Sequence, residues 1–93
     1  MHAPLDAAQI AESLAALPAW ARDDDTIVRT YELDSFAAAI AFVVRIGFLA
    51  EAADHHPDLD VRWRKVHVAL TTHDAGGITA QDFALARQIE GLV

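Results

Sequence analysis

The segment from Phe36 to about Ala52 restricts the folds open to this chain more than any other stretch. Asp34 and Ser35 supply a helix N-cap in front of it, and nearly every residue within it is apolar, which predicts a long helix. Its apolar side chains fall on two sides of that helix: Phe36, Ile40, Val43 and Gly47 on one, and Phe42, Ile46 and Leu49 on the other. A helix with so wide an apolar arc must bury more than one face. In a chain of 93 residues, we expect the second face to meet another subunit.

Length and composition place the chain among small globular domains. Its 93 residues, 54% hydrophobic and 23% charged, predict a single domain over residues 1–93 with one hydrophobic core. The absence of cysteine excludes disulfides, zinc–thiolate sites and thiol nucleophiles. A formal charge of −7 argues against nucleic acid or an anionic membrane as the main partner. No run approaches the roughly 18 apolar residues of a membrane span, and no basic signal-peptide region opens the chain, so we expect a cytoplasmic protein.

The remaining elements follow from local patterns. We expect a helix from the Asp6 cap to about Leu17, strands near 20–22, 26–33, 59–63 and 65–72, and a last helix opened by a capping-box-like segment at 79–82. The order helix-strand-strand-helix-strand-strand-helix predicts an α+β fold: a four-stranded antiparallel sheet with three helices packed on one face. In the last strand, Val66, Val68, Leu70 and Thr72 alternate with a second face that includes His67 and His73.

The five histidines are the chemically distinctive residues. An imidazole with a pKa near 6.5 can both give and take a proton around neutral pH. His55 and His56 follow the long helix in a polar loop, and Glu51 and Asp54 lie close enough in sequence to orient or charge-stabilise the His55 ring. Spacing alone leaves two interpretations open. Either His55 belongs to an acid–base site, or it caps the end of the helix while His56 fills the loop.

A metal site is less favoured by the same spacing. His67 and His73 would lie roughly 20 Å apart along one strand, and the adjacent pair His55 and His56 tends to point in different directions. No HExxH helix is present, and the glycine pair 76–77 lacks the spacing of a phosphate-binding loop. The residues themselves therefore lead to a histidine-centred pocket of unknown substrate.

Position alone gives several other residues ordinary structural roles. Asp82 is an acid at the start of a helix, where the helix dipole favours it. Trp63 is more typical of a core than of a ligand platform, and Thr71 and Thr72 are ordinary strand residues. His67 is more typical of a strand surface than of a catalyst.

One spaced set of residues goes further. Glu51 is followed after three residues by His55-His56-Pro57, then after five by Trp63, after nine by His73 and after eight by Asp82. This pattern resembles the active-site signature of the pterin-4a-carbinolamine dehydratases, as do the strand 65–73 and the order of elements across nearly the whole chain. The chain departs from the family at three positions, which concern pocket walls and strand pairing. These are Ala52, Leu59 and Arg64.

The resemblance implies a dehydration. 4a-Hydroxytetrahydrobiopterin, formed when aromatic amino acid hydroxylases turn over, loses water to give quinonoid dihydrobiopterin, which allows tetrahydrobiopterin to be recycled. The hydroxyl at C4a is protonated and N5 loses a proton, so the reaction requires no metal or redox cofactor. Histidine general acid–base catalysis supplies both transfers.

The resemblance also assigns roles to single residues. His55 and His73 would form the acid–base pair, and His56 would position the pterin. The acids expected to set histidine charge and orientation are Glu51, Asp54 and Asp82. The residues expected to bind the substrate are Pro57, Trp63, Thr71 and Thr72, the two threonines through backbone hydrogen bonds to the pterin edge.

The expected partners are the pterin substrate and further copies of the chain. The resemblance implies a homodimer or homotetramer, in which edge strands pair and long helices bundle. Two alternatives remain: a non-catalytic relative that acts as a protein assembly or dimerisation cofactor, and a pterin-binding module without turnover. Retention of the three signature histidines favours the enzyme.

Overall fold

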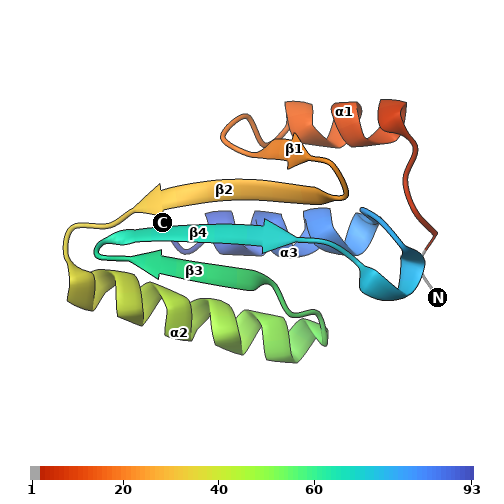
Figure 1. The fold of residues 1–93 in the computed structure, drawn as a ribbon. Coiled ribbons are helices and arrows are strands. Elements are labelled where there is room, and N and C mark those ends of the chain that lie inside the picture. The colour runs from red at the N-terminus through yellow and green to blue at the C-terminus, as the bar shows by residue number, and fades with distance from the viewer. Residues whose placement is uncertain (1–2) are drawn as a thin grey trace.

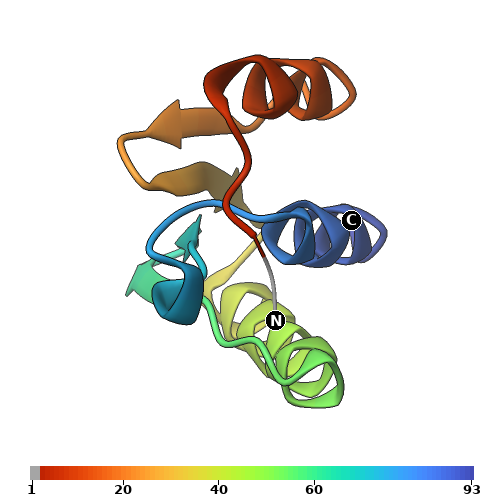
Figure 2. The ribbon, with the colours of Figure 1, turned by 90° about the vertical axis from the view of Figure 1, so that its right-hand side faces the viewer.

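The long apolar segment forms the expected helix, and the other elements follow in the predicted order. The computed structural model describes residues 3–93. Its elements are α1 (Ala7–Ala15), β1 (Ala21–Asp23), β2 (Thr26–Glu32), α2 (Phe36–Ala53), β3 (Asp58–Arg62), β4 (Lys65–Leu70), the 3-10 turn η1 (His73–Ala75) and α3 (Ala80–Glu90). The strands form one antiparallel sheet in the order β1-β2-β4-β3. All three helices lie on one side of this sheet (Figures 1 and 2), which confirms the predicted α+β fold.

One strand boundary differs from the prediction and moves a candidate residue. β4 ends at Leu70 rather than at residue 72, because its last pair with β2 is Ile27 with Leu70. His73 therefore begins η1 instead of extending the strand. The expectation that His67 and His73 share one strand face is wrong. The bounds of the other strands agree with the prediction to within one residue.

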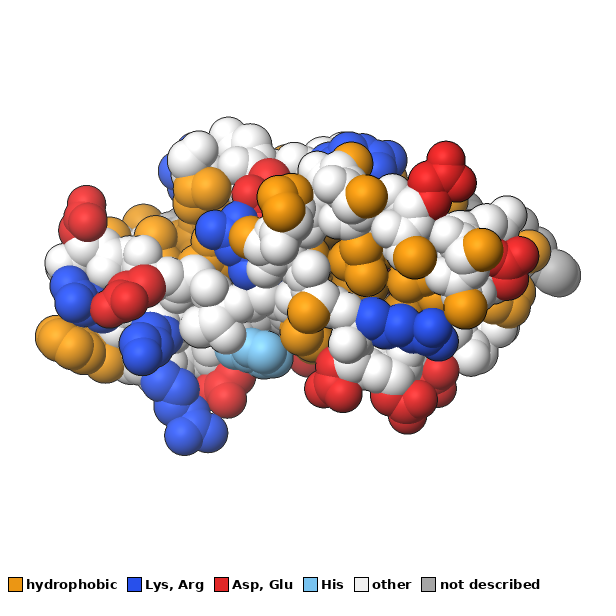
Figure 3. All heavy atoms as spheres, turned by 90° about the horizontal axis from the view of Figure 1, so that it is seen from above, with side chains coloured by type: hydrophobic (Ala, Val, Ile, Leu, Met, Phe, Trp, Pro, Cys, Tyr) orange, Lys and Arg blue, Asp and Glu red, His pale blue; other side chains and the backbone are white. Residues whose placement is uncertain are grey.

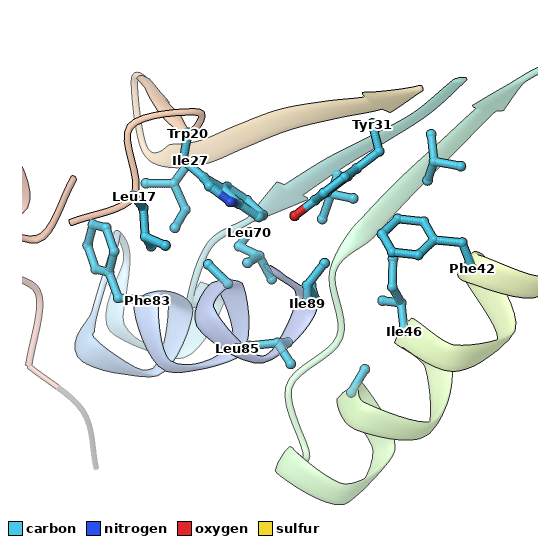
Figure 4. Close-up of a cluster of buried hydrophobic side chains, with 14 of the residues drawn as sticks. Leu17, Trp20, Ile27, Tyr31, Phe42, Ile46, Leu70, Phe83, Leu85 and Ile89 are labelled. Carbon is cyan, nitrogen blue, oxygen red and sulfur yellow. The ribbon is translucent and has the colours of Figure 1, made fainter. Parts of the chain in front are cut away.

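The hydrophobic core lies between the inner face of the sheet and the helices (Figure 4). The β4 residues that alternation places on this face are fully buried: Val66, Val68 and Leu70. The rings of Trp20, Tyr31 and Phe42 pack edge to face in a row, with centroids 6.4 and 4.8 Å apart. This row connects the first hairpin to α2 through the middle of the core.

Glu90 joins three chain segments through one carboxylate oxygen. Its Oε1 accepts hydrogen bonds from Trp20 Nε1 at 2.7 Å, from the Tyr31 hydroxyl at 2.7 Å and from the Arg29 guanidinium. Trp20, expected in the first strand, lies just before β1 with its ring buried. Partial burial opposes ionisation of Glu90, but the hydrogen bonds from Arg29, Tyr31 and Trp20 outweigh it and lower the pKa of Glu90. Burial, and then the bond to Glu90, raise the pKa of Tyr31.

Helix α2 has a buried face and an uncovered face. Its buried residues are Ala39, Phe42, Ile46 and Ala50. A row on the other side, the α2 ridge, consists of Phe36, Ile40, Val44 and Phe48, all exposed, with Phe48 at 72%. The second apolar face predicted from the sequence is present, but it passes through Val44 and Phe48 rather than Val43 and Gly47. Residues four apart on a helix form a continuous ridge of the kind that packs between helices.

By length and composition, α2 also meets the criteria for a membrane span. Its 18 residues have a mean hydropathy of 1.9, and 22% of them are buried within the chain. Arg45 and Glu51 interrupt the apolar run, which is why the sequence shows no continuous span. One such helix is weak evidence of a span, since core helices meet the same criteria; among residues 3–93, α2 is the one helix that does.

The outer face of the sheet is uncovered and polar. Thr30 on β2 and Asp60 on β3 flank His67 on β4, and the Thr30 hydroxyl lies 2.8 Å from His67 Nδ1. The open face of the sheet lies along the lower edge of the molecule as drawn in Figure 3, and acidic and basic side chains are seen there. His67 thus belongs to a solvated surface.

We predict that Glu90→Gln lowers the free energy of unfolding at pH 7 by about 1.5–3 kcal/mol, the range for hydrogen bonds to a charged group. A carboxylate with a lowered pKa stabilises the fold above the ordinary glutamate value of about 4.3. This stabilisation is lost as the pH falls through the lower pKa of the folded state. Urea unfolding at pH 7 and at about pH 2 should therefore show the difference between variant and wild type shrinking in acid. Glu12→Gln, at an exposed position on α1, is the matched control, and an equal loss in both variants would contradict the prediction.

Candidate active site

A pocket of about 580 Å³ opens at the end of the sheet where α2 stops and α3 begins. Figure 2 looks onto this end of the molecule. The pocket is bounded by the loop after α2, the segment after β4 and the first turn of α3. Its lining residues are Asp54, His55, His56, Thr71, Thr72, His73, Asp74, Ala75 and Gln81. All three signature histidines therefore reach one cavity, although they come from two different loops.

The end of α2 turns His55 into the protein. Asp54 is the C-cap residue in the left-handed conformation, with φ 49° and ψ 44°, and the His55 N–H donates to the Ala50 carbonyl at 3.0 Å. This reversal is a common way to end a helix, and aspartate is among the residues that tolerate the left-handed region. The chain leaves the helix with His55 buried and its neighbour His56 exposed.

His55 and Asp82 form a buried pair at the base of the pocket. His55 Nε2 lies 2.5 Å from Asp82 Oδ1, and the Asp82 side chain is fully buried. Asp82 is the third residue of α3, and its Oδ2 accepts from the Thr79 main-chain N–H at 2.9 Å, which completes the predicted capping box. The ordinary role in helix capping and the role beside a histidine are thus both performed by one side chain.

Glu51 belongs to a different histidine than expected. Its Oε1 lies 2.6 Å from His56 Nε2, and the two side chains form an exposed pair at the rim of the pocket. The expectation that Glu51 and Asp54 orient His55 is not met, because the partner of His55 is Asp82 on α3. Sequence distance misled here: Glu51 and His55 are four residues apart, but His55 follows the helix reversal and points away from that face.

Thr71 and Thr72 differ in what they offer to the pocket. The Thr71 hydroxyl donates to the Asp25 carbonyl at 2.6 Å, and the Thr72 hydroxyl donates to Asp82 Oδ2 at 2.9 Å. The Thr72 main chain is also occupied, since its N–H donates to Gly77 and its carbonyl accepts from the η1 turn. Backbone hydrogen bonds from Thr72 to a pterin are therefore not available in this structure.

The main-chain N–H and C=O of Thr71, unlike those of Thr72, have no partner among the described residues and are free to bind a ligand. The Leu33 N–H donates to the Arg64 carbonyl just before β4, and in an antiparallel pair such bonds recur at every second residue. The main-chain groups of the even-numbered residues of β4 therefore bond to β2, and those of the odd-numbered residues point toward β3. β3 begins only at Asp58, which pairs with Ala69. Thr71 lies beyond that pair, and no main-chain hydrogen bond of Thr71 is found within residues 3–93. Its N–H and C=O thus face the side that β3 has left open.

Several predicted and unpredicted residues remain to be placed. Trp63 lies in the tight turn between β3 and β4, 70% exposed and with Arg64 above its ring, so the structure does not bring it to the pocket. Pro57 is half-buried beside His56 but does not line the cavity. Sequence reasoning missed Gln81, Asp74 and Ala75 as lining residues; Gln81 lies directly before the signature Asp82, which is the one signal that could have found it.

The arrangement suits proton transfer. An ionised carboxylate only accepts hydrogen bonds, so the contact with Asp82 places a proton on His55 Nε2. His55 Nδ1 makes no hydrogen bond within residues 3–93 and is not among their buried unpartnered atoms, so it faces the pocket. Neutral His55 therefore presents a lone pair to a ligand in the cavity that the exposed His73 also lines. In the part of the chain that the structure describes, no group of three or more His, Cys, Asp or Glu side chains could hold a metal ion.

Comparison with known proteins gives one consistent result. The family model for pterin 4 alpha carbinolamine dehydratase matches residues 3–92. A relative from Roseiflexus castenholzii is 55% identical over 93 residues, 100% of both chains, and one from Chloroflexus aurantiacus is 56% identical over 89 residues, 96% of both chains. Both bear the name "Putative pterin-4-alpha-carbinolamine dehydratase".

Solved structures agree with this match. The crystal structure of a transcriptional coactivator/pterin dehydratase from Brucella melitensis has a TM-score of 0.92 and 31% identity, covering 96% of this chain and 97% of that one. A pterin dehydratase-like protein identified as a RuBisCO assembly factor in the alpha-carboxysome shares the fold, with a TM-score of 0.64 and 19% identity over 78% of this chain and 84% of that one. With the family model covering nearly every residue and relatives matching end to end, the chain belongs to the pterin 4 alpha carbinolamine dehydratase family.

Proposed function

We propose that this chain catalyses the dehydration of 4a-hydroxytetrahydrobiopterin to quinonoid dihydrobiopterin and water. The observation that carries the proposal is the buried His55–Asp82 pair, which presents a free imidazole nitrogen to a pocket that His56 and His73 also line. A volume of about 580 Å³ is within the ordinary range for small-molecule sites. Membership of the family supplies the substrate class.

The reaction moves one proton off the pterin and one onto it. His55 Nδ1 takes the proton from N5, and the Asp82 carboxylate stabilises the positive charge that the imidazole acquires. His73 donates a proton to the C4a hydroxyl, which leaves as water while the N5 electron pair forms the C4a–N5 double bond. After the products leave, His55 Nδ1 releases its proton to solvent in the open pocket and the exposed His73 takes one up, which restores the starting protonation of both residues. The step balances without a metal or redox cofactor.

Other lining groups hold the pterin. The exposed His56–Glu51 pair stands at the rim and can pack against or hydrogen-bond one edge of the ring. The free main-chain N–H and C=O of Thr71 offer a donor and an acceptor side by side. Such a pair matches the alternating donor and acceptor atoms on the pterin edge.

A non-catalytic role as an assembly factor or pterin sensor is the alternative. The structure keeps a histidine held by a buried acid, and such an arrangement has a desolvation cost that a scaffold has no reason to retain. We therefore favour the enzyme.

Replacing single histidines tests the mechanism. We predict that His55→Ala and His73→Ala each lower kcat by about 10²- to 10⁴-fold, the usual contribution of a positioned acid or base. His56→Ala should mainly raise KM, because its role is to hold the ring. Stopped-flow measurement of carbinolamine dehydration, corrected for the spontaneous rate, gives these values. His67→Ala, on the open sheet face, is the control and should keep wild-type kinetics; if it were as damaging as His55→Ala, the assignment of the pocket would be wrong.

The α2 ridge supports the further proposal of a homodimer or homotetramer. Phe36, Ile40, Val44 and Phe48 leave a row of large apolar side chains uncovered along the helix. A second copy of the same ridge is the complementary surface that symmetry supplies. Ridges of residues four apart interdigitate at a crossing angle of about −50°. This row is therefore expected to lie in a contact between α2 helices.

We predict that wild-type protein is oligomeric at micromolar concentration and that Phe48→Glu lowers its mass, from a dimer to a monomer or from a tetramer to a dimer, because a charge would be buried without a partner. Light scattering coupled to gel filtration measures the mass. Ala84→Glu adds the same charge at an exposed position of α3 and should leave the mass unchanged. A wild-type monomer, or a Phe48→Glu variant with the wild-type mass, would show that the ridge is not the contact.

A further inference from the structure

Behind the His55–Asp82 pair, two threonines form a buried chain of hydroxyl groups. Thr79 is fully buried and Thr72 nearly so. Their Oγ1 atoms lie 2.8 Å apart, and Thr72 Oγ1 lies 2.9 Å from Asp82 Oδ2. The two residues come from different elements, since Thr72 follows β4 and Thr79 is the N-cap of α3. They meet only because the turn at Gly77 folds the chain back against Thr72.

Counting protons shows in which direction the hydrogen bonds between these hydroxyl groups are donated. Thr79 Oγ1 accepts from the Gln81 N–H at 3.2 Å, and the single proton of Thr72 is given to Asp82. Thr72 must then accept the proton of Thr79, because each hydroxyl has one proton to donate. The hydrogen bonds are therefore donated in order from the Gln81 N–H to Thr79, from Thr79 to Thr72 and from Thr72 to Asp82.

The direction of these hydrogen bonds fixes the orientation of the Asp82 carboxylate. Asp82 Oδ2 accepts two hydrogen bonds, from the Thr72 hydroxyl and the Thr79 main chain, both at 2.9 Å. Oδ1 is left for one donor, His55 Nε2. A carboxylate held by only the main-chain bond could rotate about its Cβ–Cγ bond and move Oδ1 out of line with His55 Nε2, which would weaken its hold on the Nε2 proton. With Thr72 in place, both oxygens are committed.

We infer that Thr72 and Thr79 are positioning residues that hold Asp82 so that His55 keeps its proton on Nε2 and its lone pair on Nδ1 toward the pocket. Their kinetic consequence rests on the proposed dehydratase function, but the tautomer of His55 does not. This role differs from the expected one, in which Thr72 binds the pterin through its backbone. In the positioning role, neither threonine touches the substrate.

The central test is Thr72→Val, which keeps the shape and removes the hydroxyl. We predict that kcat falls about 10- to 100-fold, as expected for one lost hydrogen bond to a charged group, while KM changes less than about twofold. Nitrogen-15 NMR of the His55 ring in the free protein should show the Nε2–H tautomer in the wild type and a mixture of tautomers in the variant. Thr72→Ser restores the hydroxyl and should restore both readings.

Two further variants keep the test decisive. Thr30→Val removes a threonine hydroxyl that also bonds a histidine, His67, but on the open sheet face, and should change neither reading. Thr79→Gly removes the first hydroxyl at an N-cap, a position that tolerates glycine, and should change the tautomer in the same direction if Thr72→Val does not fold.

The outcomes separate the inference from the proposed function. An unchanged His55 tautomer in folded Thr72→Val, or in Thr79→Gly where Thr72→Val does not fold, would overturn the positioning role. A changed tautomer in a protein whose wild type shows no dehydration would support the positioning role and contradict the dehydratase. A fall in kcat that Thr72→Ser does not restore would also overturn the inference, since it would trace to packing rather than to the hydroxyl.

Discussion

The contact between Asp82 and His55 links the fold of this chain to its chemistry. One carboxylate caps α3 through the Thr79 N–H and holds the ring that faces the pocket. Because the capping box fixes where α3 begins, it also fixes where Asp82 stands relative to the loop after α2. The site thus needs no element of its own: a helix start, a helix end and the chain beyond β4 converge, and their termini supply the functional groups.

Helix α3 is anchored by a carboxylate at each end. Asp82 bonds to the pocket loops at its start, and Glu90 gathers Trp20, Arg29 and Tyr31 at its last residue. The two anchors act on opposite ends of one rigid element, so a loss at Glu90 reaches the pocket only through the orientation of α3. This separation lets the fold tolerate an open, polar pocket at one end, because the aromatic row and Glu90 stabilise the other.

Local patterns predicted most of the fold, and long-range contacts account for what they missed. Alternation placed Val66, Val68 and Leu70 inward, and the Thr79–Asp82 capping box formed as expected. The end of β4 was missed because it depends on where its neighbours stop pairing, which the strand's own residues do not encode. Spacing alone pointed to the wrong partner for His55 for a similar reason: Asp82 is 27 residues away and Glu51 only four, yet the left-handed turn at Asp54 decides the contact. Asp82 was expected beside the histidines only through the family resemblance. Trp63 fits the spaced motif but lies in a distant turn, which spacing cannot reveal.

The rate of carbinolamine dehydration by wild-type protein and Asp82→Asn tests the central claim most directly. The Thr72 hydroxyl and the Thr79 N–H both donate toward Oδ2, so the asparagine oxygen must take that place and its NH₂ must face His55. Neutral His55 would then carry its proton on Nδ1 and could not act as the base. The account predicts wild-type turnover well above the spontaneous rate and a loss of about 10²- to 10⁴-fold in a folded Asp82→Asn variant. Wild-type protein without acceleration, or Asp82→Asn at the wild-type rate, would contradict it.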